Sequence, residues 1–136
     1  MRRYAVAVVT VMVLIGLVAC GSGPPKHPLA KELAQRLERA GLCDHPRLNR
    51  HRRREVLCAT RRDGGRTGVA TFETHRRALR SLANTRRSVR YIGCDFHAPA
   101  GPLTLVLGPR FVVVGSDQPA EVARVLRAKV LPPAEC

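Results

Sequence analysis

Aromatic side chains are scarce in this 136-residue sequence, which has no tryptophan, two tyrosines and three phenylalanines. Proteins that bind single-stranded nucleic acid stack the bases on aromatic side chains. The net charge of +14 would by itself suggest a nucleic acid partner. The shortage of stacking side chains argues against a single-stranded partner, and the export signal described below argues against nucleic acid in general. We therefore expect no nucleic acid partner and a different use for the positive charge.

Carboxylates and catalytic motifs are also few. The chain has 10 acidic residues against 24 lysines and arginines. It lacks the nucleophile elbow, the P-loop, the dinucleotide fingerprint and the metalloprotease helix, whose residue patterns are tied to particular chemistries. It has no CxxC pair, and its five histidines are scattered, which disfavours a zinc site. We therefore expect no catalytic residues, no metal and no cofactor.

Only one long apolar run is present, the uncharged stretch from Ala5 to Ala19. It is shorter than the ~20 apolar residues of a transmembrane helix, and no stop-transfer segment follows it. Arg2 and Arg3 precede the run, and small residues stand at its end. This arrangement is typical of a secretory signal peptide, so we assign residues 1–19 to one.

The end of this segment reads Leu17-Val18-Ala19-Cys20. These residues resemble the lipobox of bacterial lipoproteins, in which Leu, a small or β-branched residue and Gly or Ala precede a cysteine. The resemblance implies cleavage between Ala19 and Cys20 and a diacylglyceryl group on the Cys20 sulfur. Because two or three acyl chains hold a protein in a bilayer almost permanently, we expect a lipid anchor at the extracytoplasmic face of the cell membrane.

The rest of the chain divides into a tether and one domain. Residues 20–27 carry the lipidated cysteine and a flexible stretch with glycine and proline, and residues 28–136 suit a single domain. Fully extended, the tether reaches about 20 Å at ~3.3 Å per residue, so the domain should lie close to the membrane. Cleavage would leave 22 basic and 10 acidic residues, a net charge of +12. The anionic partners expected there are lipid headgroups, wall polymers and acidic protein surfaces.

Four cysteines remain after Cys20, and an even number in an exported chain predicts disulfide bonds. They are Cys43, Cys58, Cys94 and Cys136. Four cysteines allow three pairings, and the sequence does not choose among them. We favour Cys43 with Cys58, which would close a short loop worth about 3 kcal/mol, and Cys94 with Cys136, which would tie down the C-terminal tail.

Hydrophobic periodicity and turn signals predict an α+β fold. We expect helices from Pro28 to about Ala40, from Thr74 to about Asn84, and after Ser116 or Asp117, with strands over residues 55–60, 67–72, 89–96, 103–107 and 111–114. Gly41 would cap the first helix. Val130 would lie on the apolar face of the last helix, which Pro132-Pro133 would end. The expected architecture is a small antiparallel sheet of about five strands, stapled by disulfides, with the helices packed on one face.

Several positions of the domain match a group of known proteins. They are Gly41-Leu42-Cys43, Cys58, Phe72, and Val112-Val113-Val114-Gly115. With these residues the domain is similar to small, uncharacterised extracytoplasmic lipoproteins of high-GC Gram-positive bacteria. The resemblance supports the pairing of Cys43 with Cys58 and implies no catalytic residue.

Arginines are densest between positions 47 and 54, and His45 and His51 lie nearby. The run contains Arg47, Arg50, Arg52, Arg53 and Arg54. Such a run is either an anion-binding loop or a solvated loop whose charges repel one another. The hypothesis that follows is a binding or interaction module, held near the membrane or cell wall, that contacts anionic partners through this basic surface.

Asp95 and His97 leave a second hypothesis open. A histidine beside a carboxylate can act as a general base, and Asp44 and Asp95 each follow a cysteine. The alternative function is therefore a small envelope hydrolase, or a redox protein that uses its cysteines.

Overall fold

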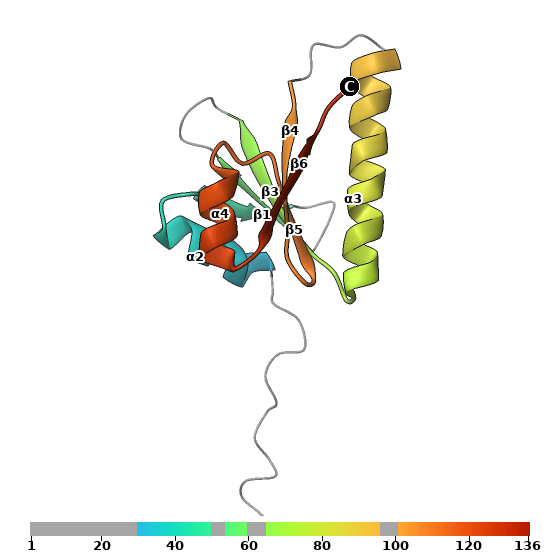
Figure 1. Ribbon diagram of the computed structural model, residues 1–136. Coiled ribbons are helices and arrows are strands. Elements are labelled where there is room, and N and C mark those ends of the chain that lie inside the picture. The colour runs from blue at the N-terminus through green and yellow to red at the C-terminus, as the bar shows by residue number, and fades with distance from the viewer. Residues whose placement is uncertain (1–29, 50–53, 60–64, 96–100) are drawn as a thin grey trace, which may run out of the picture.

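The computed structural model describes residues 30–49, 54–59, 65–95 and 101–136. In this part of the chain, six strands form one antiparallel sheet in the order β1-β2-β3-β5-β4-β6. The elements in chain order are α2 (Ala30–Arg39), β1 (Asp44–Leu48), β2 (Glu55–Ala59), β3 (Arg66–Thr71), α3 (His75–Arg90), the π-helix η1 (Tyr91–Asp95), β4 (Leu103–Leu107), β5 (Phe111–Val114), α4 (Pro119–Leu126) and β6 (Lys129–Ala134). The α+β class, the antiparallel sheet and the disulfide staples expected from the sequence are confirmed (Figure 1).

Helices α2 and α4 cover one face of the sheet. The buried residues of α2 recur at helical spacing: Ala30, Leu33, Ala34 and Leu37. They share a core with Val122 and Leu126 of α4, with Val69 of β3 and with Val113 of β5. The sequence predicted a helix here from its hydrophobic periodicity, and this buried stripe is the part of that pattern that packs in the core.

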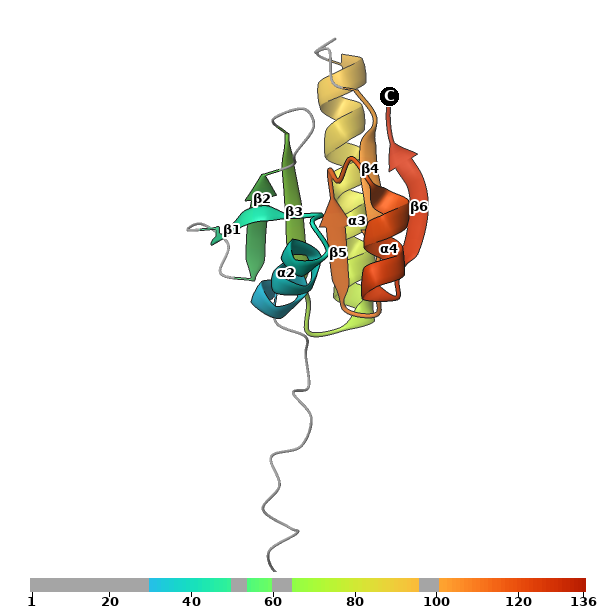
Figure 2. The same ribbon diagram turned by 90° about the vertical axis from the view of Figure 1, so that its left-hand side faces the viewer.

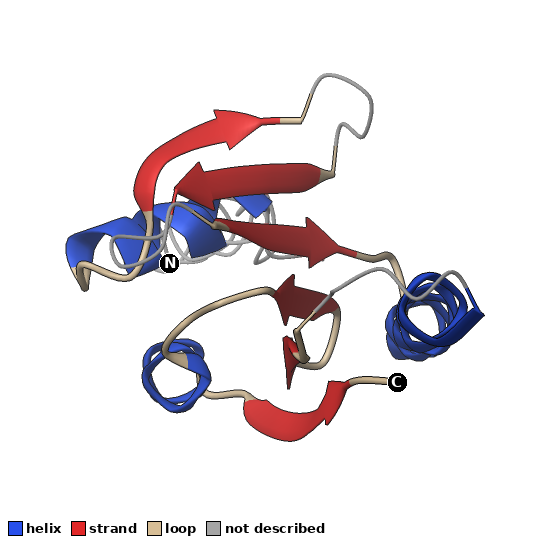
Figure 3. Ribbon diagram, turned by 90° about the horizontal axis from the view of Figure 1, so that it is seen from above, coloured by secondary structure: helices blue, strands red, loops and turns tan. Residues whose placement is uncertain are grey.

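Helix α3 covers the opposite face, as the view along the sheet shows (Figure 3). Its buried Ala78 and Leu82 pack with Leu105 of β4 and Val112 of β5 in a second core. The expectation that all helices lie on one face is therefore corrected for α3. The reason is that β4 and β5 are apolar on both faces: Val112 and Val113 point to opposite sides, and both are at most 2% exposed.

Within the segment predicted as a strand at 89–96, residues 89–95 are helical instead, and Phe96 lies outside the described residues. Helix α3 continues to Arg90, and η1 follows it to Asp95. Val89 packs against the second core in line with Ala78 and Leu82, so the helical packing pattern outweighs the strand preference of this segment.

The C-terminal segment is a strand rather than a helix end. α4 stops at Leu126, and Arg127 takes a left-handed conformation with φ 53°. Val130 then lies in β6, where it pairs with Val106 of β4. Pro132 and Pro133 therefore lie inside an edge strand. Proline is tolerated there because an outer strand has unpaired positions that need no N–H group. Nor do Ser116 or Asp117 cap α4, which begins after Gln118, although the Ser116 hydroxyl accepts from the Gln118 N–H.

Gly41 ends α2 as the sequence predicted. Its φ is 72°, the N–H of Gly41 donates to the Glu38 carbonyl, and the N–H of Leu42 donates to the Leu37 carbonyl. This pair of bonds is a Schellman motif, which satisfies carbonyls left open at a helix end. The tight turn brings Cys43 to the start of β1, beside β2.

Candidate functional site

Both expected disulfides are present. Cys43 joins Cys58 of β2 with a Cα–Cα distance of 5.1 Å, and both residues are 1% exposed. Cys94 of η1 joins Cys136 at the end of the chain. All four cysteines of the described residues are therefore paired, and none of them is a free thiol.

The predicted lipidation site Cys20, with the signal peptide and tether, lies outside the described residues. Within the residues that are described, no helix has both the length and the apolarity to cross a membrane. Anchoring through Cys20 therefore stays a prediction from the sequence.

The arginines between positions 47 and 54 do not form one loop in the structure. Arg50, Arg52 and Arg53 lie outside the described residues, Arg47 belongs to strand β1 rather than to a loop, and Arg54 stands just before β2.

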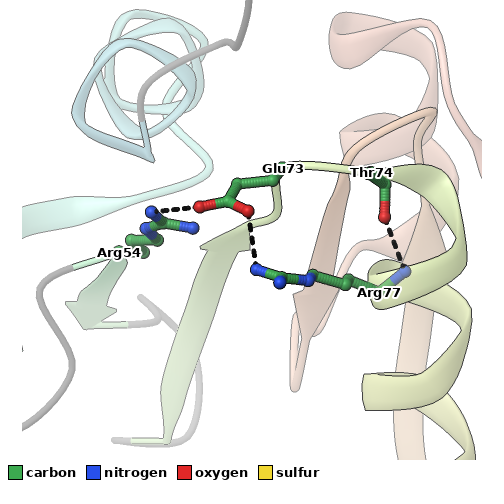
Figure 4. A network of polar contacts seen from close by, with 4 residues as sticks. All are labelled: Arg54, Glu73, Thr74 and Arg77. Carbon is green, nitrogen blue, oxygen red and sulfur yellow. Dashed lines mark hydrogen bonds and ion pairs between the residues drawn. The ribbon is translucent and has the colours of Figure 1, made fainter.

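Arg54 is occupied by an ion pair (Figure 4). Its Nη2 donates to Glu73 Oε1 at 2.8 Å, and Arg77 Nη1 donates to Glu73 Oε2 at 2.6 Å. Thr74 caps α3 beside this network, where its Oγ1 accepts from the Arg77 N–H at 3.2 Å. Exposed pairs of this kind contribute about 0–1 kcal/mol each, so the network mainly orients the entry to α3.

Arg47 lines an open groove of about 540 Å³ along β1 and β2. The residues that line this β1 groove are His45, Arg47, Leu48, Asn49, Leu57, Cys58, Ala59 and Arg66. Arg47, Arg66 and His45 are basic and exposed, Leu48, Leu57 and Ala59 are apolar, and no lining residue is acidic. The groove thus combines an apolar strip with cationic side chains at its rim.

The strand register places the two arginines on one face of the sheet. Arg47 stands opposite Leu57, and Arg66 stands opposite Ala59. Since residues two apart in a strand share a face, Leu57 and Ala59 bring both arginines to the same side. The two backbones are about 10 Å apart across the strands, twice the spacing between strands, and about 7 Å apart along them, which makes about 12 Å in all.

The register places two carboxylates on that face: Asp44, which stands opposite Ala59 and does not line the groove, and Glu55. Asn49 Nδ2 donates to Glu55 Oε2 at 3.4 Å, and Glu55 does not line the groove.

The free edge of β1 is poorly suited to bind another strand. Its register shifts between Asp44 and Arg47, His45 has a φ of 48°, and Pro46 lacks an N–H group. Bulges and prolines of this kind protect sheet edges from pairing with other chains. A ligand at this edge would therefore be held by the side chains of the groove.

A second basic groove, of about 740 Å³, was missed by sequence reasoning. It is lined by Thr74, His75, Leu107, Gly108, Pro109, Arg110, Arg127, Ala128 and Lys129, and we call it the basal groove. His75 Nδ1 lies 2.8 Å from the Pro109 carbonyl oxygen and donates to it. The strands predicted over residues 103–107 and 111–114 imply a turn at Gly108-Pro109-Arg110, but nothing in the sequence placed Arg127 and Lys129 beside that turn.

The structure does not show Asp44, Asp95 and His97, the residues considered for a hydrolase, together in one site. Asp95 ends η1, Asp44 lies in β1, and His97 is outside the described residues. Among the residues that the structure describes, no group of three or more His, Cys, Asp or Glu side chains could hold a metal ion.

No protein-family model, no curated protein and no solved structure matches this chain. The two resemblances noted in the sequence, to the lipobox and to small lipoproteins of high-GC Gram-positive bacteria, therefore remain expectations.

Proposed function

We propose that this protein is a lipid-anchored binding module on the extracytoplasmic face of the cell membrane, and that its β1 groove holds an anionic ligand. The observation that carries this proposal is the placement of Arg47 and Arg66 on one face, around an apolar strip, with no acidic residue lining the groove.

The chemistry of the groove favours a chain-like ligand. Two guanidinium groups can each form bidentate hydrogen bonds to phosphate or carboxylate oxygens. Their backbones are about 12 Å apart, with the apolar Leu57 and Ala59 on the strand between them, so a flexible anionic chain can contact both guanidinium groups while it crosses the apolar strip. The ligand classes that fit are an anionic wall polymer and an acidic protein segment.

The two disulfides support the extracytoplasmic part of the proposal. Disulfides persist in oxidising compartments and are rare where thiols are kept reduced. Together with the apolar segment before Cys20, they favour export to the outer side of the membrane.

The proposal is tested with the full chain in neutral detergent and two probes, sodium polyphosphate and poly-L-glutamate. We expect saturable binding that weakens steeply with salt, because exposed charges are screened within about 10 Å at 0.1 M salt. Arg47→Ser with Arg66→Ser should weaken binding about tenfold, at up to ~1 kcal/mol for each basic residue near an anionic surface.

A matched control removes the same charge elsewhere. Arg80→Ser with Arg87→Ser takes two exposed arginines from α3 and should leave the affinity within about twofold of the unchanged chain. Equal weakening by both pairs would mean that net charge alone attracts the probe, and would remove the β1 groove from the proposal. The stronger of the two probes identifies the ligand class as phosphate or carboxylate.

A further inference from the structure

The basal groove gathers basic residues from three separate parts of the chain. His75 comes from the first turn of α3, Arg110 from the turn between β4 and β5, and Arg127 and Lys129 from the junction of α4 and β6. No acidic residue lines this groove. Glu73, which precedes the capping Thr74, has its carboxylate engaged by Arg54 and Arg77.

These basic residues lie at one end of the molecule, and the described chain begins at the same end. Figures 1 and 2 place the start of α2, the turn between β4 and β5, the junction of α4 and β6 and the first turn of α3 together, opposite the C-terminus. Ala30 is the first described residue and stands ten positions after Cys20. A fully extended chain of that length spans about 35 Å at most.

The opposite end of the domain is farther from Ala30, where the described chain begins. Helix α3 has 16 residues and runs from this end toward the other, a length of about 24 Å at 1.5 Å per residue. The end with the basal groove is therefore the one that can meet the membrane with the least extension of the preceding chain.

Arg127 occupies a conformation that favours another residue. Its φ of 53° and ψ of 52° lie in the left-handed region, where glycine is the usual choice after a helix. The arginine at this position presents a cation at the groove despite that backbone preference.

From these observations we propose that the basal groove docks on the anionic headgroups of the membrane that holds the chain, so that the domain stands with this end on the lipid surface. The inference rests on the membrane attachment in the proposed function. Strand β1 runs along the side of the sheet (Figure 2), so docking in this orientation leaves the β1 groove open to ligands.

The test uses the full chain reconstituted into vesicles of phosphatidylcholine alone and of phosphatidylcholine mixed with phosphatidylglycerol. A water-soluble amine-reactive reagent labels Lys129, and an Arg90→Lys substitution supplies an exposed reference amine at the far end of α3 without changing the charge. Peptide mass spectrometry gives both rates. We expect phosphatidylglycerol to slow labelling of Lys129 about fivefold, because several nearby cations each favour the anionic surface, and to leave the reference amine unchanged.

Three double variants identify the residues responsible. Arg110→Gln with Arg127→Gln should abolish the slowing, whereas Arg80→Gln with Arg87→Gln should preserve it with the same loss of charge. Arg110→Lys with Arg127→Lys, which keeps the charge, should restore it if the glutamine pair unfolds.

Two results would overturn the inference. One is equal labelling of Lys129 in the two kinds of vesicle. The other is equal slowing in phosphatidylcholine vesicles after addition of soluble polyphosphate, which would make the groove a general polyanion site. Mass spectrometry of the N-terminal peptide of the same sample shows whether Cys20 carries a lipid, so a failure of the lipidation proposal is distinguished from a failure of headgroup docking.

Discussion

Arg86 of α3 donates from Nη2 to the carbonyl oxygen of Pro132 at 2.7 Å, and from Nη1 to that of Pro133 at 3.3 Å. The two prolines lie in β6, 46 and 47 residues further along the chain. Proline offers no N–H group to a sheet ladder, but its carbonyl still accepts. Arg86 therefore links the proline-containing end of β6 to α3, and both elements pack in the second core.

Replacement of Arg86 should loosen this end of the sheet. We expect Arg86→Ala to lower the free energy of unfolding by about 1 kcal/mol, the usual net value of a hydrogen bond in a partly exposed setting. Urea unfolding followed by circular dichroism measures the change. Arg87→Ala, the exposed neighbour, is the matched control and should change stability by less than about 0.5 kcal/mol. Identical effects of the two substitutions would contradict the role given to Arg86.

The two disulfides should be reduced in a fixed order. Cys43 and Cys58 are each 1% exposed, whereas Cys136 is exposed at the chain end. Thiol–disulfide exchange needs access to a sulfur, so a phosphine titration should open Cys94–Cys136 first. Alkylation and peptide mapping at each step measure the order, and earlier alkylation of Cys43 or Cys58 would refute it.

Thr67 carries a buried hydroxyl whose removal should stabilise the protein. The residue is 0% exposed, and its Oγ1 has no hydrogen-bond partner among the described residues. A buried polar group without a partner costs about 1–3 kcal/mol, so Thr67→Val, which keeps the shape, should raise the free energy of unfolding by about 1 kcal/mol. Thr67→Ser keeps the hydroxyl and loses a methyl group, and should lower it. Chemical denaturation that showed Thr67→Val to be the less stable of the two would contradict this account.

Arg127 offers a second route to higher stability. A non-glycine residue in the left-handed region destabilises the folded state by roughly 1–2 kcal/mol. Glycine avoids this cost, but its greater conformational entropy in the unfolded chain offsets part of the gain. We expect Arg127→Gly to raise the free energy of unfolding by about 0.5–1 kcal/mol. Arg127→Ala removes the same charge but keeps Cβ, and should gain nothing. A thermal scan of the three chains separates the effect of the backbone from that of the charge.

Loss of the proposed anchor at Cys20 should relocate the protein without unfolding it. Cys20 is separate in sequence from the four cysteines of the disulfides, so Cys20→Ser should leave both bonds intact. The expected result is loss of the lipid-modified N-terminal peptide in mass spectrometry and a shift of the chain from the membrane to the soluble fraction. An unmodified N-terminus in the unchanged chain would remove lipidation from the proposed function.

Sequence patterns predicted those elements whose signals lie within a few residues. The stripe of Leu33 and Leu37 and the cap at Gly41 determine α2, and the apolar runs on either side of Gly108 determine β4 and β5. The four cysteines allowed three pairings, and the structure has the one favoured from the sequence, Cys43 with Cys58 and Cys94 with Cys136. The basic residue Arg47 was recognised, but its position beside Arg66 required the register of β1, β2 and β3.

The sequence by itself therefore determined the elements with strong local periodicity, the α+β class and the amino acids available for the site. Only the tertiary structure decided that residues 89–95 extend a helix, that Val130 and the two prolines form an edge strand, and that Arg127 and Lys129 meet the turn at Arg110. The physical reason is that these outcomes depend on partners far along the chain: the second core for Val89, strand β4 for β6, and Arg86 for the proline carbonyls. Local preference is a weak influence on such segments, and packing against distant partners overrides it.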